Sequence, residues 1–367
     1  MIVMRRRDIK QVPLLLSLLG AAGLCVMTPE VAAAAEALPK LGVELAKTSV
    51  SGLSSGAYMA GQFHLAFSNT VVGAGVVAGG PWGCASNGSG DALLLGGFDN
   101  AARALTGCMQ VTGGAPDGGK LAKAAATFAH KHRIDSLAGL RGDRIYLFHG
   151  ESDSVVAAPV AAAAEAFYRS AGIRAEDLHA VYLLPEGKAG HALVVDHDGS
   201  ACSANSSPFI DNCKYDQAGE ILRWIYPDLV GRPGPARGRK VVFDQTEFLA
   251  GAVGWGLARE GVVYIPPDCE AKVGCRVHIV FHGCLQSRTT DGFGDAFIER
   301  TGYLRYADAN RIVLLFPQTN ANTAPNACWD CWGYASSDHQ SKTAPQLAAV
   351  RAMLERLAEP REGSPVL

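Results

Sequence analysis

The feature that most constrains this chain is a regular alternation of short apolar runs with longer alanine-rich stretches. Short runs rich in β-branched residues are typical of strands, and the longer stretches have the length and composition of helices. Such alternation favours an α/β fold with a mainly parallel sheet flanked by helices. Strands are expected at residues 48–52, 71–78, 144–149, 180–184, 241–244, 261–265, 277–282 and 311–316. Helices are expected at 57–67, 121–131, 159–171 and 217–225.

The size and composition fit a folded protein rather than a disordered one. The 367 residues are 48% hydrophobic and 19% charged, which is enough to bury a full core. One linker-like stretch, residues 231–239, divides the chain without giving either side the pattern of an independent domain. We therefore expect a single domain at 36–367 with two halves, 36–230 and 239–367. The net charge is -2 and no basic cluster follows the first ten residues, so nucleic acid is not an expected partner.

The N-terminus has the order of features of an export signal. Four basic residues among the first ten precede an apolar run at 12–27 and an alanine-rich exit at 32–35. The apolar run is too short to span a bilayer comfortably, and the alternative to a signal is a buried N-terminal helix. We expect residues 1–35 to be removed and the mature protein to be secreted or periplasmic, without stable membrane insertion. Asp8 stands where a twin-arginine signal usually has an apolar residue, so the export route stays open.

Nine of the ten cysteines follow this signal, which agrees with an oxidising compartment. Three pairs are close in sequence, Cys202 with Cys213, Cys269 with Cys275, and Cys328 with Cys331. Short-loop disulfides are the favoured interpretation, and the odd number leaves one thiol unpaired. A structural zinc is the alternative, but the Cys-x-x-Cys at 328–331 has no second half nearby.

Residues 52–56, Gly-Leu-Ser-Ser-Gly, match the G-x-S-x-G pattern of a nucleophile elbow. In such an elbow a strand turns sharply into a helix and exposes a serine, and small residues are needed where backbones approach closely. A short pattern of Gly and Ser arises easily by chance. Here it follows an expected strand and precedes an expected helix, so we predict that Ser54 is a nucleophile.

A serine needs a base that a carboxylate orients, and in α/β-hydrolases the three follow in the order Ser, Asp, His. Asp153 lies just beyond the strand at 144–149, at the sheet edge where open α/β folds gather functional groups. It can instead be a turn residue or a helix N-cap. His191 follows the next apolar run between two small residues and is the expected base, with His197 as its rival.

The chain also offers two donors for an oxyanion hole. One is the N–H of Ser55, directly after the nucleophile. The other normally comes from a His-Gly strand end that precedes the elbow, whereas here His282-Gly283-Cys284 lies far downstream of Ser54. The economical interpretation is a circular permutation, in which residues after about 238 give the first strands of the sheet.

Four segments together resemble the single-domain, circularly permuted poly(3-hydroxybutyrate) depolymerases of the α/β-hydrolase superfamily. These segments are 52–60, 78–84, 282–284 and 328–334. The resemblance covers nearly the whole mature chain. It implies a catalytic triad of Ser54, Asp153 and His191, and an oxyanion hole formed by the amides of Ser55 and Cys284.

The resemblance also implies that an aromatic near the last segment lines the substrate cleft, with Trp332 favoured over Trp329. Ordinary packing is the alternative for both. The family has Trp where this chain has Cys331, so the resemblance favours a disulfide between Cys284 and Cys328 and leaves Cys331 as the odd thiol or a rival partner. Cys84 and Cys108 are a further possible pair, but connectivity cannot be deduced from sequence.

The expected function is that of an exported serine esterase which hydrolyses poly(3-hydroxybutyrate), or related 3-hydroxyalkanoate polymers and oligomers, through an acyl-enzyme. This chemistry requires no metal or organic cofactor. One alternative is a carbohydrate esterase that releases feruloyl or acetyl groups, as from acetylxylan. An alternative of another class is a non-catalytic polymer-binding protein that keeps the fold. The sequence gives no indication of oligomeric state.

Overall fold

The computed structural model describes residues 35–86, 96–230, 234–249 and 255–361. The export signal expected at 1–35 lies outside these ranges except for its last residue. Residues 35–367 form one compact unit, in which the two halves of the chain contribute strands to one sheet. In the ranges given, no helix has the length and apolar character needed to cross a membrane.

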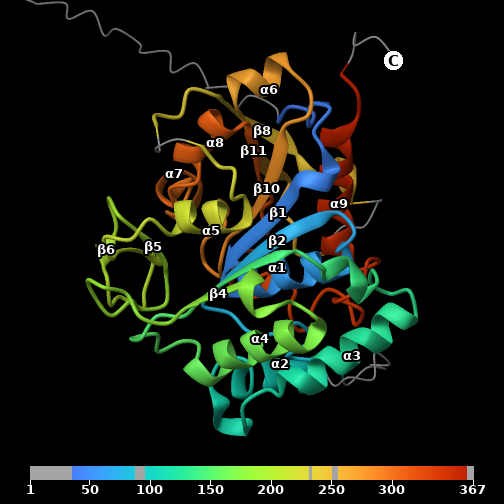
Figure 1. Ribbon diagram of the computed structural model, residues 1–367, viewed down its shortest axis with the longest axis vertical. Coiled ribbons are helices and arrows are strands. Elements are labelled where there is room, and N and C mark those ends of the chain that lie inside the picture. The colour runs from blue at the N-terminus through green and yellow to red at the C-terminus, as the bar shows by residue number, and fades with distance from the viewer. Residues whose placement is uncertain (1–34, 87–95, 231–233, 250–254, 362–367) are drawn as a thin grey trace, which may run out of the picture. The chain divides into compact units, whose positions relative to one another are not determined.

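All eight strands expected from the sequence form, and they make a single sheet (Figure 1). Their order across it is β4-β3-β2-β1-β10-β11-β9-β8. The bounds are β1 Thr48–Leu53, β2 Val71–Val77, β3 Arg144–Phe148, β4 Leu178–Val181, β8 Arg239–Asp244, β9 Glu260–Ile265, β10 Arg276–Phe281 and β11 Ile312–Phe316. Neighbours run parallel except at β9, which is antiparallel to both β8 and β11. The α/β fold with a mainly parallel sheet is thus confirmed.

The central position of β1 explains how distant parts of the chain meet. It pairs in parallel with β2 on one side and with β10 on the other, where Thr48 lies opposite Val277 and Gly52 opposite Phe281. All six residues of β1 are buried. The strand is therefore covered on both faces, although its sequence keeps polar side chains at Thr48, Ser49 and Ser51. Because the two strands are parallel, the turn after β1 and the loop after β10 lie at the same edge of the sheet.

Helices cover both faces of the sheet (Figure 1). One apolar core contains buried residues of α1, α3, α4 and α9, and the other contains those of α5, α7 and α8. The bounds are α1 Ser55–Ala66, α2 Gly96–Thr106, α3 Gly118–His130, α4 Ala158–Ala171, α5 Gln217–Ile225, α6 Pro267–Ala271, α7 Ala296–Arg300, α8 Leu304–Asn310 and α9 Pro345–Ala358. The four expected helices are α1, α3, α4 and α5, and the other five were not expected.

A second, three-stranded sheet was not expected either. It consists of β5 Leu193–Val195, β6 Ser200–Ala201 and β7 Ile210–Asn212 in the order β5-β7-β6. The disulfide between Cys202 and Cys213 closes the loop that contains β7. We call residues 189–213 the small lobe. Strands of two or three residues are too short to show an alternating pattern in the sequence.

Four disulfides form in the described part of the chain, and Cys331 is a free thiol there. They join Cys84 to Cys108, Cys202 to Cys213, Cys269 to Cys275, and Cys284 to Cys328. The interpretation of Cys328 and Cys331 as a close pair is wrong, because Cys328 bonds with Cys284 instead. The reason is the sheet: these two cysteines follow β10 and β11, which are parallel neighbours, so their loops meet at one edge.

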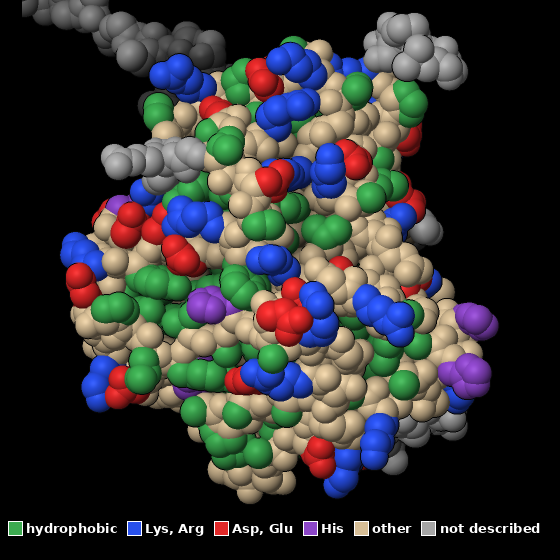
Figure 2. Space-filling model, viewed as in Figure 1, with side chains coloured by type: hydrophobic (Ala, Val, Ile, Leu, Met, Phe, Trp, Pro, Cys, Tyr) green, Lys and Arg blue, Asp and Glu red, His purple; other side chains and the backbone are tan. Residues whose placement is uncertain are grey.

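Charged side chains of both signs are interspersed on the face shown in Figure 2. Lys240, for example, forms ion pairs with Asp295 and with Glu299. Exposed pairs of this kind contribute little to stability, at most about 1 kcal/mol each. The pattern agrees with the small net charge of the chain.

Candidate active site

The turn after β1 has the geometry of a nucleophile elbow. Ser54 has φ 57° and ψ -120°, a backbone conformation that is strained for any residue with a β-carbon. A β-carbon at Gly52 would lie 2.2 Å from the carbonyl oxygen of Gly56, and one at Gly56 would lie 2.3 Å from that of Phe281. Both glycines are therefore required, since strand, helix and the end of β10 meet here with no room for side chains.

Asp153 lies in the loop after β3, and its two carboxylate oxygens have different partners. Oδ1 accepts hydrogen bonds from the N–H groups of Val155 at 2.8 Å and Val156 at 2.9 Å. Oδ2 lies 2.8 Å from Nδ1 of His191, and the side chain is fully buried. Asp153 thus makes the hydrogen bonds of a turn residue through Oδ1, while Oδ2 contacts His191. Asp153 is not the helix N-cap, because α4 begins at residue 158 and is capped by Ala157.

His191 is held with one nitrogen toward Asp153 and its ring against Phe209, edge to face at 6.0 Å. The carboxylate accepts from Nδ1–H, which leaves Nε2 as the acceptor that a general base needs. Ser54 and His191 line the same pocket. Among the described residues, the hydrogen bonds of His191 go to Asp153 and Asn205, and none joins its Nε2 to Ser54 Oγ. Such bonds often become short only when substrate is bound.

The alternative base, His197, lies elsewhere. Its Nδ1 contacts Asp196 at 2.8 Å, and Arg305 contacts the same pair at the surface of the molecule. The side chain of His197 is 35% exposed and does not line the pocket. The expectation that His191 is the better base therefore agrees with the geometry.

One residue that the sequence did not single out connects the acid and the base. Asn205 accepts hydrogen bonds from the N–H groups of Ser154 and His191 at 3.0 and 2.9 Å. Its amide nitrogen donates to the carbonyls of Ser152 and Ser203 at 3.0 and 3.1 Å. Asn205 thus fixes the residues on both sides of Asp153 and the backbone of His191. A lone Asn in a polar stretch carries no sequence signal for this role.

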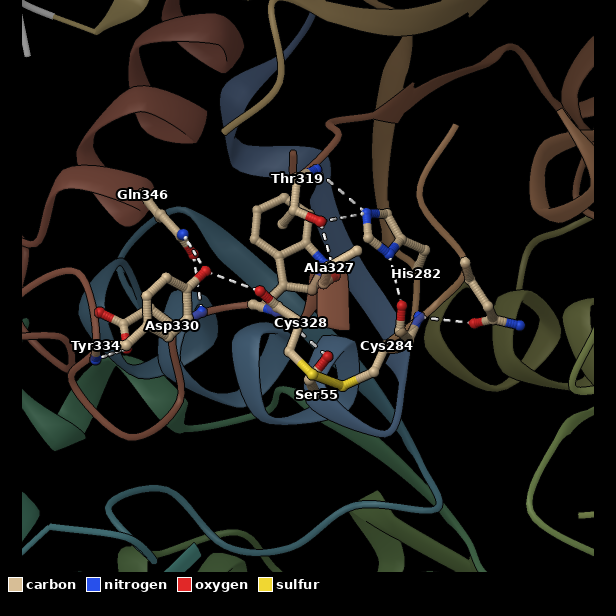
Figure 3. The surroundings of a disulfide bond; sticks show 12 residues. Ser55, His282, Cys284, Thr319, Ala327, Cys328, Asp330, Tyr334 and Gln346 are labelled. Atoms are coloured by element: carbon tan, nitrogen blue, oxygen red, sulfur yellow. Dashed lines mark hydrogen bonds between the residues drawn. A yellow bond between two sulfur atoms is a disulfide. The ribbon is translucent and has the colours of Figure 1, made fainter. Parts of the chain in front are cut away.

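The two expected oxyanion donors come from different elements, the start of α1 and the loop after β10. The N–H of Ser55 is at the first turn of α1, where the helix dipole favours negative charge. The N–H of Cys284 follows β10, and the disulfide to Cys328 holds that loop (Figure 3). Neither N–H forms a hydrogen bond within the described part of the chain. Ser55 and Cys284 both line the pocket that contains Ser54 and His191.

This pocket has a volume of about 550 Å³ and walls that are mostly apolar. Its lining includes Leu53, Met109, Val155, Val156, Phe209 and Leu285. Trp332 is part of the wall, whereas Trp329 is fully buried and packs its ring against Phe281 and His282. The structure therefore brings Trp332 to the site and does not bring Trp329 there.

The loop that presents Trp332 is organised by a buried carboxylate. Asp330 accepts hydrogen bonds from four successive backbone N–H groups, those of Gly333, Tyr334, Ala335 and Ser336. Burial raises the pKa of Asp330, while His339 and the amide hydrogen bonds lower it. Tyr334, at the end of this turn, donates its hydroxyl hydrogen to the carbonyl of Cys328 at 2.8 Å (Figure 3). The Cys328 disulfide and the Trp332 wall are thus parts of one rigid loop.

Comparisons with known proteins agree with this geometry. No family model matches the chain. The polyhydroxybutyrate depolymerase of Talaromyces funiculosus is 32% identical over 352 residues, which cover 90% of this chain and 95% of that protein. This chain belongs to the polyhydroxybutyrate depolymerase family. A poly(3-hydroxybutyrate) depolymerase of Delftia acidovorans is 38% identical over 339 residues, 90% of this chain, but the match spans only 63% of that relative's length.

Solved structures of the depolymerase family show the same fold. The crystal structure of the PHB depolymerase from Penicillium funiculosum has a TM-score of 0.75 and 31% identity, and the match covers 88% of this chain and 98% of that one. A PHB depolymerase with a serine-to-alanine substitution, complexed with an R3HB trimer, has a TM-score of 0.76 at the same identity and coverage.

Proposed function

We propose that this protein is a serine esterase that hydrolyses poly(3-hydroxybutyrate), or related 3-hydroxyalkanoate polymers and oligomers. The observation that carries the proposal is the convergence on one pocket of the strained Ser54 and of His191, which is hydrogen-bonded to a buried Asp153. Membership of the depolymerase family supports the choice of a polyester as the substrate.

In the proposed mechanism Ser54 Oγ attacks the ester carbonyl while Nε2 of His191 takes its proton. Asp153 fixes the imidazole with Nδ1 protonated and stabilises the imidazolium that forms. The N–H groups of Ser55 and Cys284 stabilise the oxyanion of the tetrahedral intermediate. His191 then returns the proton to the leaving alcohol, and a water molecule hydrolyses the acyl-enzyme by the same steps in reverse order.

The walls of the pocket suit an uncharged ester chain. No Lys, Arg, Asp or Glu is among the described residues that line it, and aliphatic side chains and Trp332 make most of the surface. Repeating units of a 3-hydroxyalkanoate carry methyl or alkyl branches and no charge, so they lose little solvation on entering such a pocket. Trp332 is the proposed aromatic contact for the chain.

Export is part of the proposal, with removal of residues 1–35 and a secreted or periplasmic mature protein. Four disulfides support an oxidising compartment. We also propose that 36–367 is one catalytic domain of circularly permuted α/β-hydrolase type. The position of β10 beside β1, with the His-Gly-Cys loop at its end, supports the permutation.

The test is a panel of substrates run on the wild type and on Ser54→Ala together. We expect the wild type to clear suspensions of amorphous poly(3-hydroxybutyrate), and Ser54→Ala to leave them turbid. Release of ferulate or acetate from plant polysaccharide, with no clearing, would identify a carbohydrate esterase instead. Labelling of Ser54 by a fluorophosphonate distinguishes an enzyme from a protein that only binds polymer.

A further inference from the structure

His282 is a buried residue that the mechanism above does not use. It directly follows β10 and is fully shielded from solvent. Its Nδ1 lies 2.7 Å from the carbonyl oxygen of Gly283, and its Nε2 lies 3.3 Å from the backbone nitrogen of Thr319 (Figure 3). A carbonyl can only accept and a backbone N–H can only donate, so the proton must be on Nδ1.

The imidazole is held in this one state. Burial lowers the pKa of His282 to about 4, so the ring is neutral at ordinary pH. Nε2 has two neighbours at 3.3 Å, the backbone N–H of Thr319, which can only donate, and the hydroxyl oxygen of Thr319. The hydroxyl of Thr319 donates its hydrogen to the carbonyl of Ala327 at 2.7 Å, and the neutral ring with its proton on Nδ1 satisfies both Gly283 and the N–H of Thr319. The donor on Nδ1 is thus fixed toward Gly283.

The carbonyl that His282 binds belongs to the same peptide unit as the N–H of Cys284. In a trans peptide the C=O and N–H bonds point in opposite directions. Fixing the carbonyl oxygen on the buried side therefore fixes the N–H of Cys284 toward the other side. That side is the pocket, which Cys284 lines together with Ser54.

The neighbouring peptide is held as well. The N–H of Gly283 donates to Oε1 of Gln286 at 2.7 Å, and the N–H of Gln286 donates back to the carbonyl of Gly283 at 3.3 Å. The disulfide to Cys328 fixes Cys284 from its side chain. Both polar groups of Gly283 thus have protein partners, whereas the N–H of Cys284 has none in the described structure.

We propose that His282 is a positioning residue, which orients the peptide between Gly283 and Cys284 so that the N–H of Cys284 faces the oxyanion formed at Ser54. This inference rests on the function proposed above. An oxyanion donor is worth about a hundredfold to a thousandfold in kcat, and it acts only when it is aimed correctly before the reaction begins. His282 fixes the orientation of this N–H from the buried side of the loop, without contact with substrate.

Two substitutions by amide side chains distinguish the roles of the two ring nitrogens. In His282→Asn the side-chain amide nitrogen reaches the place of Nδ1 and can donate to Gly283. In His282→Gln the amide reaches the place of Nε2 and leaves nothing at Nδ1. Both lose the ring that packs against Trp329 and Phe297, so a merely structural role would affect them alike.

The experiment measures kcat and KM on a soluble 3-hydroxybutyrate ester, with thermal unfolding of each variant as the control for folding. We expect His282→Gln to lower kcat about a hundredfold with little change in KM, and His282→Asn to stay within about tenfold of the wild type. The inhibition constant of an alkyl trifluoromethyl ketone, whose serine adduct carries the same oxyanion, should rise in His282→Gln by the factor by which kcat/KM falls. Equal kcat in the two variants, or a loss confined to KM, would overturn the inference.

A measurement on the wild type keeps the inference testable if a variant does not fold. ¹⁵N NMR of the histidine rings should show His282 protonated at Nδ1 and slow to exchange, and protonation at Nε2 alone would contradict our account. Failure of the proposed function has a different signature, since it leaves the wild type without ester hydrolysis or Ser54→Ala with full activity.

Discussion

The elbow region and the small lobe build the two sides of one site by different physical means. Around Ser54 the geometry is imposed by the backbone: sheet register, two glycines without room for a β-carbon, and a strained φ. Around His191 it depends on side chains, with Asn205 joining the acid and base loops and one disulfide closing the lobe. We infer that the position of Ser54 cannot be altered in small steps by side-chain substitution. The position of His191 can, because single substitutions remove single hydrogen bonds.

The largest effect is expected on the elbow side. Ser54→Ala removes the attacking oxygen and should lower kcat at least about a thousandfold. The backbone strain at residue 54 does not depend on the hydroxyl, so circular dichroism and the unfolding midpoint should match those of the wild type. An active variant, or one that unfolds early, would mean that the elbow is not what we describe.

On the acid–base side we expect substitutions to lower the rate only partly. Asn205→Ala removes the four hydrogen bonds to Ser152, Ser154, His191 and Ser203, and a displaced base costs up to about a hundredfold in rate. We expect kcat to fall about tenfold to a hundredfold with KM nearly unchanged. Asn212→Ala is the matched control, since Asn212 lies in the same lobe and accepts only from the N–H of Lys214. Similar losses in both variants would show that the lobe responds as a whole and that Asn205 has no special role.

Between the two sides lies the free thiol of Cys331, in the pocket wall beside Trp332. Burial raises the pKa of this thiol, so little of it is thiolate at pH 8 and it should react slowly with N-ethylmaleimide. Once attached, the group fills part of the pocket, and ester hydrolysis should fall severalfold in step with labelling measured by mass spectrometry.

Cys331→Ser is the control for this experiment. It should keep most of the activity and be insensitive to the reagent. Complete labelling of Cys331 with unchanged hydrolysis would place the thiol outside the path of the substrate.

The smallest effect is one of stability alone. Asp211 in β7 is fully shielded from solvent, and neither carboxylate oxygen has a hydrogen-bond partner among the described residues. Burial raises its pKa from 3.8 to about 7. The folded protein therefore binds this proton more tightly than the unfolded chain, and the free energy of unfolding decreases as pH rises from about 4 to about 7.

Asp211→Asn stays neutral at every pH and should raise the unfolding midpoint at pH 8, with little change at pH 4. Differential scanning calorimetry at both pH values measures this, with the exposed Asp291→Asn as the control. A stabilisation that is the same at pH 4 and pH 8 would mean that ionisation of Asp211 is not its cause. Activity should not change, which would separate the stability of the small lobe from its catalytic geometry.

The same contrast explains how far the sequence could be interpreted. The eight strands of the large sheet are four to seven residues long and most are strongly apolar, so their positions were predictable. Helix α9 was missed although Leu347, Val350, Leu354 and Leu357 have helical spacing behind Pro345 at the first turn, so its signal was present. Helices α6, α7 and α8, of five to seven residues, are too short to show a period.

The candidate site divides in the same way. Ser54, Asp153 and His191 could be proposed from the sequence because each follows an apolar run at the carboxyl edge of the sheet. The link through Asn205 could not be found, because it depends on how three loops pack and not on any local pattern. Trp329 is buried in the core and Trp332 lines the pocket. The sequence could not show this difference, because nothing in it tells which of two tryptophans three residues apart faces the core.

The pairing of β1 with β10 has a consequence for the order in which the protein is made. The strand that leads into the elbow, β1, lies at residues 48–53 and is synthesised early, whereas its neighbour β10 lies at residues 276–281. Closing so long a loop is slow and costs chain entropy. The proposed nucleophile, Ser54, is therefore translated early but lacks its proposed oxyanion donor at Cys284 until the last third of the chain has been synthesised.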